Sequence, residues 1–408
     1  MSEGVRVLHA LKLHGIGGVE RVFESYLEGT RDDRLEHHVL VLGGRIHPYF
    51  RELVRRRAAS VHFLKYAGPL KLPKTPGFLR TTHMTRTIDA VKPDILLVYN
   101  RFGHTDILHA AGRASRPPVC VHYEHGAGWG RHGPPRVSDF LDLVDGTIAV
   151  CHAARRVLEL KWGCSAAQSY TCHNGVRLAP PAGVVPKSLS AWRPLRLGLV
   201  GKLAWRKAPV VAVHTLARLK AAGRPFELHV AGEGPEFQNI QTVAGQLNVA
   251  SDLRMHGLIE GMEQFYSDMD ILIHPSAHEA LPTVCIEAGR FGCPVIATKV
   301  DGIPEIVEDG QSGCCMPATE PPEYYSELGG SQVTDPEPVY DPETDRLVPL
   351  RFPNPDALAE AVLRITESEA KFRQMSARAH ERAMSEFGLT AYIERLNGLL
   401  LGFAQGGN

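Results

Sequence analysis

The sequence predicts an α/β protein made of two doubly wound domains, and three observations support this fold class. The chain has 408 residues, which is more than one hydrophobic core usually holds. Short apolar runs alternate with stretches of helical spacing, as where residues 5–11 precede residues 19–28; this is the pattern of a parallel sheet with crossover helices. The alternation restarts at residue 195, after a proline-rich segment at 178–186, so we expect a linker between two domains.

The composition is that of an ordinary globular protein, with 44% hydrophobic and 22% charged residues. The formal net charge is zero, so we expect no nucleic-acid partner. The eight cysteines form no Cys-x-x-Cys pair, which favours small core residues in a reducing compartment. We see neither a signal peptide nor a run of about 18 apolar residues. We therefore expect a cytoplasmic protein, at most peripheral on the inner face of the cell membrane.

One region, 51–92, is strongly basic although the whole chain is neutral. It holds ten basic residues against Glu52 and Asp89, for a local net charge of +8. The basic residues are Arg51, Arg55, Arg56, Arg57, Lys65, Lys71, Lys74, Arg80, Arg86 and Lys92. A solvated basic face, a contact with anionic lipid headgroups and a contact with an acidic acceptor all fit this charge.

The stretch 276–302 carries two carboxylates, Glu279 and Glu287, eight positions apart. Because proline suits the first turn of a helix, Pro282 predicts that Glu279 lies in a loop and Glu287 inside the following helix. The neighbours of Glu287 are apolar, so we expect it in a largely buried wall, facing a polar group. The free N–H groups at the helix start suit an anion. Carboxylates can bind the hydroxyl groups of a sugar, and the adjacent helix N-terminus can bind a phosphate. Together they predict a nucleotide-sugar site.

Two turns after predicted strands add groups suited to phosphate. Lys202 and Lys207 flank a strand-to-helix turn that begins at Gly201, and such cations favour phosphate binding. Near the N-terminus, Gly17 and Gly18 follow the first strand, where glycines let the backbone approach a ligand. Their spacing does not match the dinucleotide fingerprint, and a plain tight turn is the alternative.

A polar loop follows the predicted strand at 119–122. It contains His122, Glu124 and His125, and strand carboxyl ends in such sheets face the ligand crevice. A functional histidine or acid is therefore expected here, and the sequence alone leaves all three residues open.

The pattern Glu279-x7-Glu287, followed by Gly292-x-Pro294 and Gly302-Ile-Pro304-Glu305, resembles the retaining glycosyltransferases of family 4. The resemblance covers nearly the whole chain and is most specific from 197 to 313. It implies the GT-B fold, in which two Rossmann-like doubly wound domains face each other across a cleft.

The resemblance also implies domain bounds. We expect an N-terminal acceptor-side domain at 1–178, a linker at 179–194, a nucleotide-sugar-binding domain at 195–386, and a final helix at 387–408 that crosses back to the first domain. The segment 317–354 departs from the family and is rich in Pro, Asp, Glu and Tyr without periodicity. We predict an irregular insert there: an acceptor lid, a partner contact or a disordered loop.

The implied activity is a retaining transfer of a sugar from a nucleotide-diphosphate sugar to a hydroxyl acceptor, in bacterial surface polysaccharide, glycolipid or glycoside biosynthesis. No Asp-x-Asp stands where a metal-dependent transferase needs one, so we expect no metal and no cofactor. Alternatives with the same fold are a sugar-nucleotide epimerase, a phosphorylase and a non-catalytic sugar-nucleotide-binding protein.

The resemblance assigns roles to individual residues. Groups expected at the donor's diphosphate are Lys202, Lys207, the helix start at Leu281, Pro282 and Thr283, and the backbone at Gly17, Gly18 and Gly201. Arg206 is expected to compensate for Lys202, which replaces the family's usual Arg, and Ala208 replaces a usual Gly.

The remaining assignments concern the sugar and the nucleoside. Glu279 and His125 are expected to contact the transferred sugar, although His122 and Glu124 stay open as alternatives to His125. Glu287 is expected to bind the ribose, and Gly232 and Leu258 to border the base.

Overall fold

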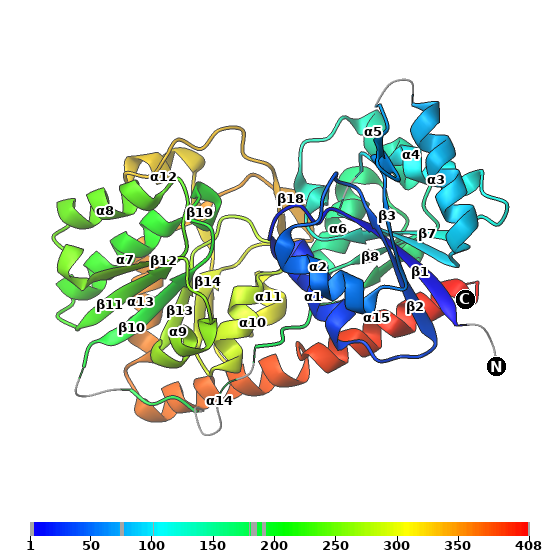
Figure 1. The fold of residues 1–408 in the computed structure, drawn as a ribbon. Helices are drawn as coiled ribbons and strands as arrows, with labels where there is room; N and C mark the ends of the chain where they lie inside the picture. Colours follow the sequence, from blue (N-terminus) through cyan, green and yellow to red (C-terminus); the bar gives the residue numbers. More distant parts are fainter. Residues whose placement is uncertain are drawn as a thin grey trace. The chain divides into compact units, whose positions relative to one another are not determined.

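The computed structural model describes residues 4–73, 77–100, 102–178, 180, 186–189 and 193–406, and Figure 1 shows its ribbon. By their contacts, the residues form two compact units. Unit 1 is Met1–Gly175 together with Leu389–Asn408, and unit 2 is Val176–Gly388. Most of the predicted linker, 179–194, lies outside the described residues.

Unit 1 is built on a seven-stranded parallel sheet of order β3-β2-β1-β6-β7-β8-β9. Its strands are β1 (Val5–Leu11), β2 (Leu35–Val41), β3 (Ser60–Phe63), β6 (Ile95–Tyr99), β7 (Val119–Glu124), β8 (Gly146–Ala149) and β9 (Ser169–Thr171). The crossover helices are α1 (Gly18–Gly29), α2 (Pro48–Arg57), α3 (Phe78–Val91), α4 (Thr105–Gly112), α5 (Pro134–Leu141) and α6 (His152–Trp162). A small hairpin of β4 (Tyr66–Ala67) and β5 (Leu70–Lys71) precedes α3. The alternation of strand and helix is thus confirmed for this half of the chain.

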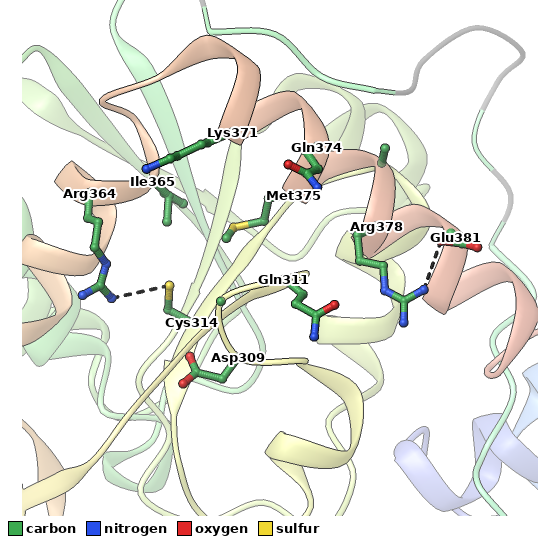
Figure 2. A pocket seen from close by; sticks show the side chains of 12 residues that line it. Asp309, Gln311, Cys314, Arg364, Ile365, Lys371, Gln374, Met375, Arg378 and Glu381 are labelled. Carbon is green, nitrogen blue, oxygen red and sulfur yellow. Dashed lines mark hydrogen bonds and ion pairs between the residues drawn. The ribbon is translucent and has the colours of Figure 1, made fainter.

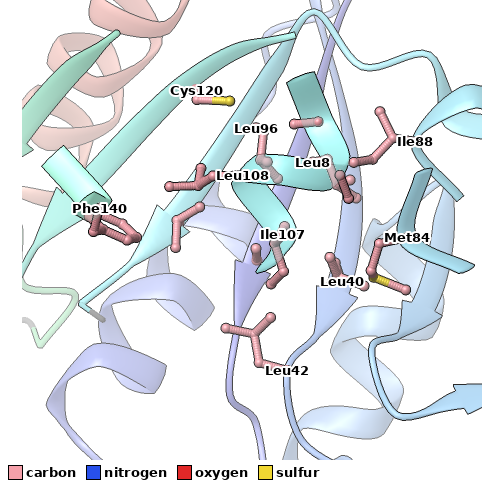
Figure 3. Close-up of a cluster of buried hydrophobic side chains, with 14 of the residues drawn as sticks. Leu8, Leu40, Leu42, Met84, Ile88, Leu96, Ile107, Leu108, Cys120 and Phe140 are labelled. Atoms are coloured by element: carbon pink, nitrogen blue, oxygen red, sulfur yellow. The ribbon is translucent and has the colours of Figure 1, made fainter. Parts of the chain in front are cut away.

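One face of this sheet carries an apolar core. Because strand side chains alternate between faces, Leu8 and Leu40 point to the side covered by α3 and α4, where Met84 and Ile107 are buried with them (Figure 3). Phe140 of α5 joins the same cluster. This burial is the driving force that fixes the helices on the sheet.

The opposite face carries buried polar side chains. His9 of β1 is hydrogen-bonded through Nε2 to His37 Nδ1 (3.0 Å) and through Nδ1 to the Tyr99 hydroxyl (3.0 Å). The last helix, α15 (Leu389–Ala404), packs in this unit, and its Asn397 accepts a hydrogen bond from the Tyr26 hydroxyl (2.7 Å). Burial lowers the pKa of His37 to about 4 and that of His9 well below its ordinary value. Both rings are therefore neutral at pH 7.

Unit 2 repeats the plan with a six-stranded parallel sheet of order β12-β11-β10-β13-β14-β15. The strands are β10 (Leu195–Val200), β11 (Phe226–Ala231), β12 (Leu253–Gly257), β13 (Ile271–His274), β14 (Val295–Thr298) and β15 (Gly313–Met316). Its helices are α7 (Pro209–Ala221), α8 (Phe237–Gln246), α9 (Met262–Asp268), α10 (Thr283–Arg290), α11 (Ile303–Ile306), α13 (Pro355–Ile365) and α14 (Glu369–Ser385).

The prediction that the insert 317–354 is irregular was wrong. It contains α12 (Pro322–Glu327) and two short antiparallel pairs: β16 (Ala318–Glu320) with β19 (Phe352–Pro353), and β17 (Val339–Asp341) with β18 (Arg346–Val348). Tyr325 is fully buried and stacks on Phe352, with ring centroids 4.9 Å apart. Strands of two or three residues are too short to show a period in the sequence, so their pairing was invisible there. The insert is a folded part of unit 2.

Among the described residues, no helix combines the length and the apolar character needed to cross a membrane.

The buried histidines of unit 1 predict a loss of stability in mild acid. The unfolded chain takes up a proton at His37 near the ordinary pKa of 6.5, whereas the folded chain does so only near pH 4. The free energy of unfolding should therefore fall as pH drops from about 6.5 to 4, by roughly 3 kcal/mol for His37 alone. Denaturant unfolding at pH 7 and pH 4.5 measures this. His37→Gln should reduce the decline, whereas the exposed control His109→Gln should not; equal declines in the two variants would contradict the assignment.

Candidate functional site

Most of the predicted site residues lie at one edge of the sheet in unit 2. Its strands are parallel, so their carboxyl ends meet at a single edge, where ligands of such sheets bind. The segments that follow the strands at that edge carry Gly201, Lys202, Arg206 and Lys207 after β10; Gly232 after β11; Leu258 after β12; Glu279, Leu281 and Pro282 in the loop after β13; and Thr283 and Glu287 in α10, the helix that follows it. The structure thus brings these residues into the same region of unit 2.

Lys207 and Glu279 form an ion pair at the centre of this edge. Lys207 Nζ lies against Glu279 Oε1, and His274 Nε2 lies 3.4 Å from the same oxygen. The side chains of Lys207 and Glu279 are only 26% and 15% exposed. Burial lowers the pKa of Lys207 to about 8 and that of His274 well below its ordinary value. A mostly desolvated ammonium and a carboxylate therefore meet here, one suited to phosphate and the other to hydroxyl groups.

The loop that carries Glu279 is held by Asp301, which the sequence analysis did not single out. Asp301 Oδ2 accepts hydrogen bonds from the Glu279 N–H (3.0 Å) and from His278 Nδ1 (2.7 Å). The Gly302 N–H donates to the Glu279 carbonyl (3.2 Å). Asp301 is buried and has a left-handed backbone, φ 50°, a conformation that Asp and Asn tolerate better than most residues. An Asp-Gly pair after a buried strand was the available signal.

Glu287 lies inside α10, and Pro282 immediately precedes that helix, as predicted. The side chain is half-buried, and its Oε2 accepts a hydrogen bond from the buried Tyr266 hydroxyl (2.7 Å). Tyr266 is a second residue that the sequence did not reveal, because its contact with Glu287 depends on how α9 packs beside α10.

Gly232 has a packing role that is independent of any ligand. Its φ is +140°, and a Cβ at this position would lie 1.9 Å from the carbonyl oxygen of Gly201. The Gly232 N–H donates to the Gly257 carbonyl (2.7 Å), and the Gly201 N–H donates to the Ala231 carbonyl (3.0 Å). The loops after β10, β11 and β12 therefore touch backbone to backbone, and only glycine fits at 232.

The outer residues of the predicted set are more exposed. Lys202 and Arg206 lie at the surface, where the Arg206 guanidinium stands 5.1 Å from the centre of the Trp205 ring. Leu258 is 75% exposed, whereas Leu281 is buried. Ala208 adopts a left-handed conformation, φ 48°, which explains why the family's glycine suits this position.

In unit 1, the three candidates His122, Glu124 and His125 lie at the end of β7 and in the loop after it, and their contacts differ. His122 Nε2 is hydrogen-bonded to Glu124 Oε2 (3.0 Å), and Glu124 Oε1 accepts the N–H groups of Gly126 (2.5 Å) and Gly128 (2.9 Å). Both of these side chains are fully buried and hold the loop.

The His125 ring stacks on Tyr99 (5.8 Å between centroids), and its buried Nε2 has no hydrogen-bond partner in the described part of the chain. Burial lowers its pKa to about 3. His122 Nδ1 also has no hydrogen-bond partner among the described residues, but of the three candidates His125 alone is only half-buried. This exposure favours His125 as the residue available to a ligand, and its role stays a prediction.

Gly17 and Gly18 lie at the start of α1 and are exposed. Gly17 has an extended backbone, and a Cβ there would meet only the flexible Glu20 carboxylate. A Cβ at Gly18 would meet nothing within 4 Å. Neither packing nor conformation requires these glycines, so their predicted role at a ligand stays open to test.

A cavity of about 900 Å³ in unit 2 lies elsewhere (Figure 2). It is lined by Asp309–Gln311, by Arg364 at the end of α13, and by Lys371, Met375 and Arg378 of α14. These residues flank the amino end of β15, opposite the edge that carries Lys207 and Glu279. The cavity is therefore separate from the candidate site.

No metal site is evident among the residues that the structure describes, because no three His, Cys, Asp or Glu side chains gather suitably. The sequence Asp268-Met-Asp270 precedes β13, and Asp270 is engaged by two N–H groups of Arg193 (2.7 and 2.9 Å). Metal independence stays a prediction.

Two family models match the chain. Residues 187–328 match "Glycosyl transferases group 1" and residues 16–179 match "Glycosyltransferase Family 4". The putative colanic acid biosynthesis glycosyltransferase WcaL of Salmonella typhimurium is 31% identical over 135 residues, covering 31% of this chain and 33% of that protein. The lipopolysaccharide core biosynthesis glycosyltransferase LpsE of Rhizobium meliloti is 25% identical over 304 residues, covering 73% and 80%. The chain thus spans about a third of the length of WcaL.

Solved structures support the fold. A glycosyltransferase from Rickettsia africae has a TM-score of 0.74 at 15% identity, with 99% of this chain and 100% of that chain covered. Anabaena Alr3699/HepE in complex with UDP has a TM-score of 0.73 at 15% identity, covering 98% and 100%. These likenesses confirm the predicted GT-B fold.

The packing of Gly232 predicts a large and local effect of a single methyl group. Gly232→Ala should lower the free energy of unfolding by more than about 3 kcal/mol, since the new Cβ meets rigid backbone and the conformation disfavours L-residues. The control is Gly245→Ala, on the surface of α8 with open space around a Cβ, which should raise stability by about 0.5–1 kcal/mol. Denaturant unfolding of both variants is the measurement. Wild-type stability in Gly232→Ala would disprove the packing explanation.

Proposed function

The chain belongs to the glycosyl transferases of group 1, with a family 4 domain as its N-terminal half, and from that premise we propose that it is a glycosyltransferase. We propose that it moves a sugar from a nucleotide-diphosphate sugar to a hydroxyl acceptor, with retention of configuration and without a metal. The observation that carries this proposal is the contact of Lys207 with Glu279 at the carboxyl edge of a parallel sheet.

The relatives support a place in polysaccharide or glycolipid biosynthesis. WcaL is named for colanic acid biosynthesis and LpsE for the lipopolysaccharide core. HepE is described in complexes with UDP and with UDP-glucose, which makes a UDP-sugar the first donor to examine.

The proposed chemistry begins with the leaving group. Negative charge develops on the diphosphate as its bond to the sugar breaks, and a positioned cation in a poorly hydrated site stabilises that charge strongly. We assign this role to Lys207, assisted by Lys202, by Arg206 and by the free N–H groups at the start of α10. The backbone at Gly17 and Gly18 is proposed to approach the same group.

The carboxylates and His125 are proposed to orient the sugar and the nucleoside. Once a diphosphate engages Lys207, Glu279 is released to accept hydrogen bonds from hydroxyls of the transferred sugar, and Glu287 accepts those of the ribose. Neutral His125 offers an unpartnered ring nitrogen to the sugar. The acceptor oxygen then bonds to the anomeric carbon on the face that the diphosphate leaves, and its proton passes to the departing phosphate.

The basic region 51–92 is the proposed contact with an anionic membrane surface. Some of its cations are already engaged: Arg55 pairs with Glu52, and Arg56 pairs with Glu28. The exposed cation of Lys71 and the exposed apolar side chains of Leu70 and Phe78, all within this region, support such a contact. Lys74 lies outside the described residues. A cytoplasmic location at the inner face of the membrane stays a prediction.

Donor binding tests the proposed function directly. The melting temperature of the protein should rise with UDP or UDP-glucose, or else with a GDP or ADP counterpart, because a ligand that binds only the folded state stabilises it. Lys207→Met should abolish that rise. Glu279→Gln should keep the response to the nucleoside diphosphate and lose sugar transfer by about 100-fold. The control is Lys371→Met, an exposed lysine of the distant cavity.

Analysis of the reaction products separates the alternatives. Incubation with donor alone reveals an epimerase, and added phosphate reveals a phosphorylase. A protein whose melting temperature responds to no nucleotide, or a Lys207→Met variant that behaves as Lys371→Met does, would refute the proposal.

Lys207 also predicts the alkaline limb of the pH profile. Its pKa in the free protein is about 8, and only the protonated amine stabilises the leaving diphosphate. The value of kcat/KM for the donor should therefore fall as pH rises through about 8, whereas kcat should persist to higher pH because a bound diphosphate raises the pKa of the lysine. Lys207→Arg, which keeps its charge, should remove the decline in kcat/KM. A wild-type profile that is flat to pH 10 would contradict this role.

A further inference from the structure

The insert 317–354 contacts three loops at the edge of the sheet that carries the candidate site. Its Phe352 ring lies 6.5 Å from the ring of Trp205, in the turn after β10. Its Tyr325 and Ser331 bind Glu236, in the loop after β11, and its Tyr340 binds Asp301, after β14. The insert is therefore attached to the loops that carry the site residues. Three separate contacts make this attachment.

The first attachment is a buried carboxylate. Glu236 has no exposed surface, and its Oε2 accepts hydrogen bonds from the Tyr325 hydroxyl (3.1 Å) and the Ser331 N–H (3.3 Å). The Ser331 hydroxyl donates to Oε1. Detaching the insert here would leave a buried charge without these partners, which is costly. The contact therefore fixes the loop that contains Gly232.

The second attachment joins the insert to the Glu279 loop through one side chain. Asp301 Oδ1 accepts a hydrogen bond from the Tyr340 N–H (2.7 Å), and the Asp301 N–H donates to the Tyr340 carbonyl (2.9 Å). The other oxygen, Oδ2, accepts the Glu279 N–H (3.0 Å). The two oxygens of Asp301 thus hold the insert and the Glu279 loop at the same time.

The third attachment is aromatic. Phe352 stacks on the buried Tyr325 ring and also meets the Trp205 ring edge to face. Trp205 begins the short turn that ends at Lys207. The insert therefore also supports the turn that supplies the cation.

From these contacts we propose that the insert is a brace for the donor site and that Asp301 is the positioning residue through which it fixes Glu279. This inference rests on the proposed function, because it treats Glu279 as a ligand of the sugar. Residues 329–388 lie outside the matches to both family models, so the chain builds most of this brace from a segment beyond them. A lid that swings open is a different device, since opening would break the hydrogen bonds of two buried carboxylates.

Replacing one carboxylate oxygen by an amide tests the brace. In Asp301→Asn, the new NH₂ group faces an N–H donor, so either Glu279 or Tyr340 loses its partner. We expect kcat/KM for sugar transfer to fall about 10- to 100-fold, while the melting-temperature response to UDP is kept, because Lys207 is untouched. Hydrogen exchange of the ligand-free protein should accelerate together at 276–282 and at 338–342. The control is Glu343→Gln, the same chemical change at an exposed insert residue that pairs with Lys299, which should alter none of these.

A second pair of variants keeps the test decisive if Asp301→Asn does not fold. The Tyr340 N–H and carbonyl are hydrogen-bonded to Asp301, so Tyr340→Pro removes the N–H that Asp301 accepts. The substitution also removes the Tyr340 hydroxyl, which donates to Asp345 Oδ1 in the same hairpin (2.9 Å). Tyr340→Ala loses the same side chain and keeps the N–H. Faster exchange at 276–282 in the Pro variant than in the Ala variant supports the brace; equal exchange overturns it. Exchange does not depend on activity, so a protein that transfers no sugar would refute the proposed function and leave the brace still measurable.

Discussion

The candidate site depends on a lysine ammonium and a carboxylate that meet mostly out of water. Removing two charges from solvent costs free energy, and only the attraction between them offsets that cost. Burial lowers the pKa of Lys207, so its charged form is unfavourable where it lies. In the function that we propose, a diphosphate takes the cation and hydroxyl groups take Glu279. The function that we propose is this exchange.

The rest of unit 2 holds Lys207 and Glu279 in position for that contact. The pair comes from the loops after β10 and β13, which are neighbours in the sheet, so strand order alone brings the two residues together. Asp301 then fixes the main chain at Glu279, and Gly232 lets the loop after β11 press against Gly201. Charged and polar groups that are already in position need no reorganisation when charge develops in the transition state. This preorganisation is the main source of electrostatic catalysis.

In unit 1, the loop after β7 is also held by hydrogen bonds to a buried carboxylate. The Glu124 carboxylate holds the loop after β7 by accepting two N–H groups, and in doing so it takes His122 as a partner. His125 is left stacked on Tyr99 with a buried nitrogen unsatisfied. A buried polar atom without a partner is unfavourable in the free protein, and a ligand hydroxyl would relieve it.

The sequence alone determined the fold class and the local setting of both glutamates. The hydrophobic periods of two residues for strands and 3.6 residues for helices can be recognised within a short stretch of sequence. Pro282 favours a helix start through the fixed geometry of its own ring. Only the tertiary structure decided that Lys207 meets Glu279, that Tyr266 donates to Glu287, and that the insert is folded. These outcomes depend on strand order and on hydrogen bonds between residues far apart in the chain, and no local pattern encodes such partners. The insert was mispredicted for the same reason, because its short elements are anchored by distant residues: Glu236 binds Tyr325 of α12, and Asp301 binds Tyr340 of β17.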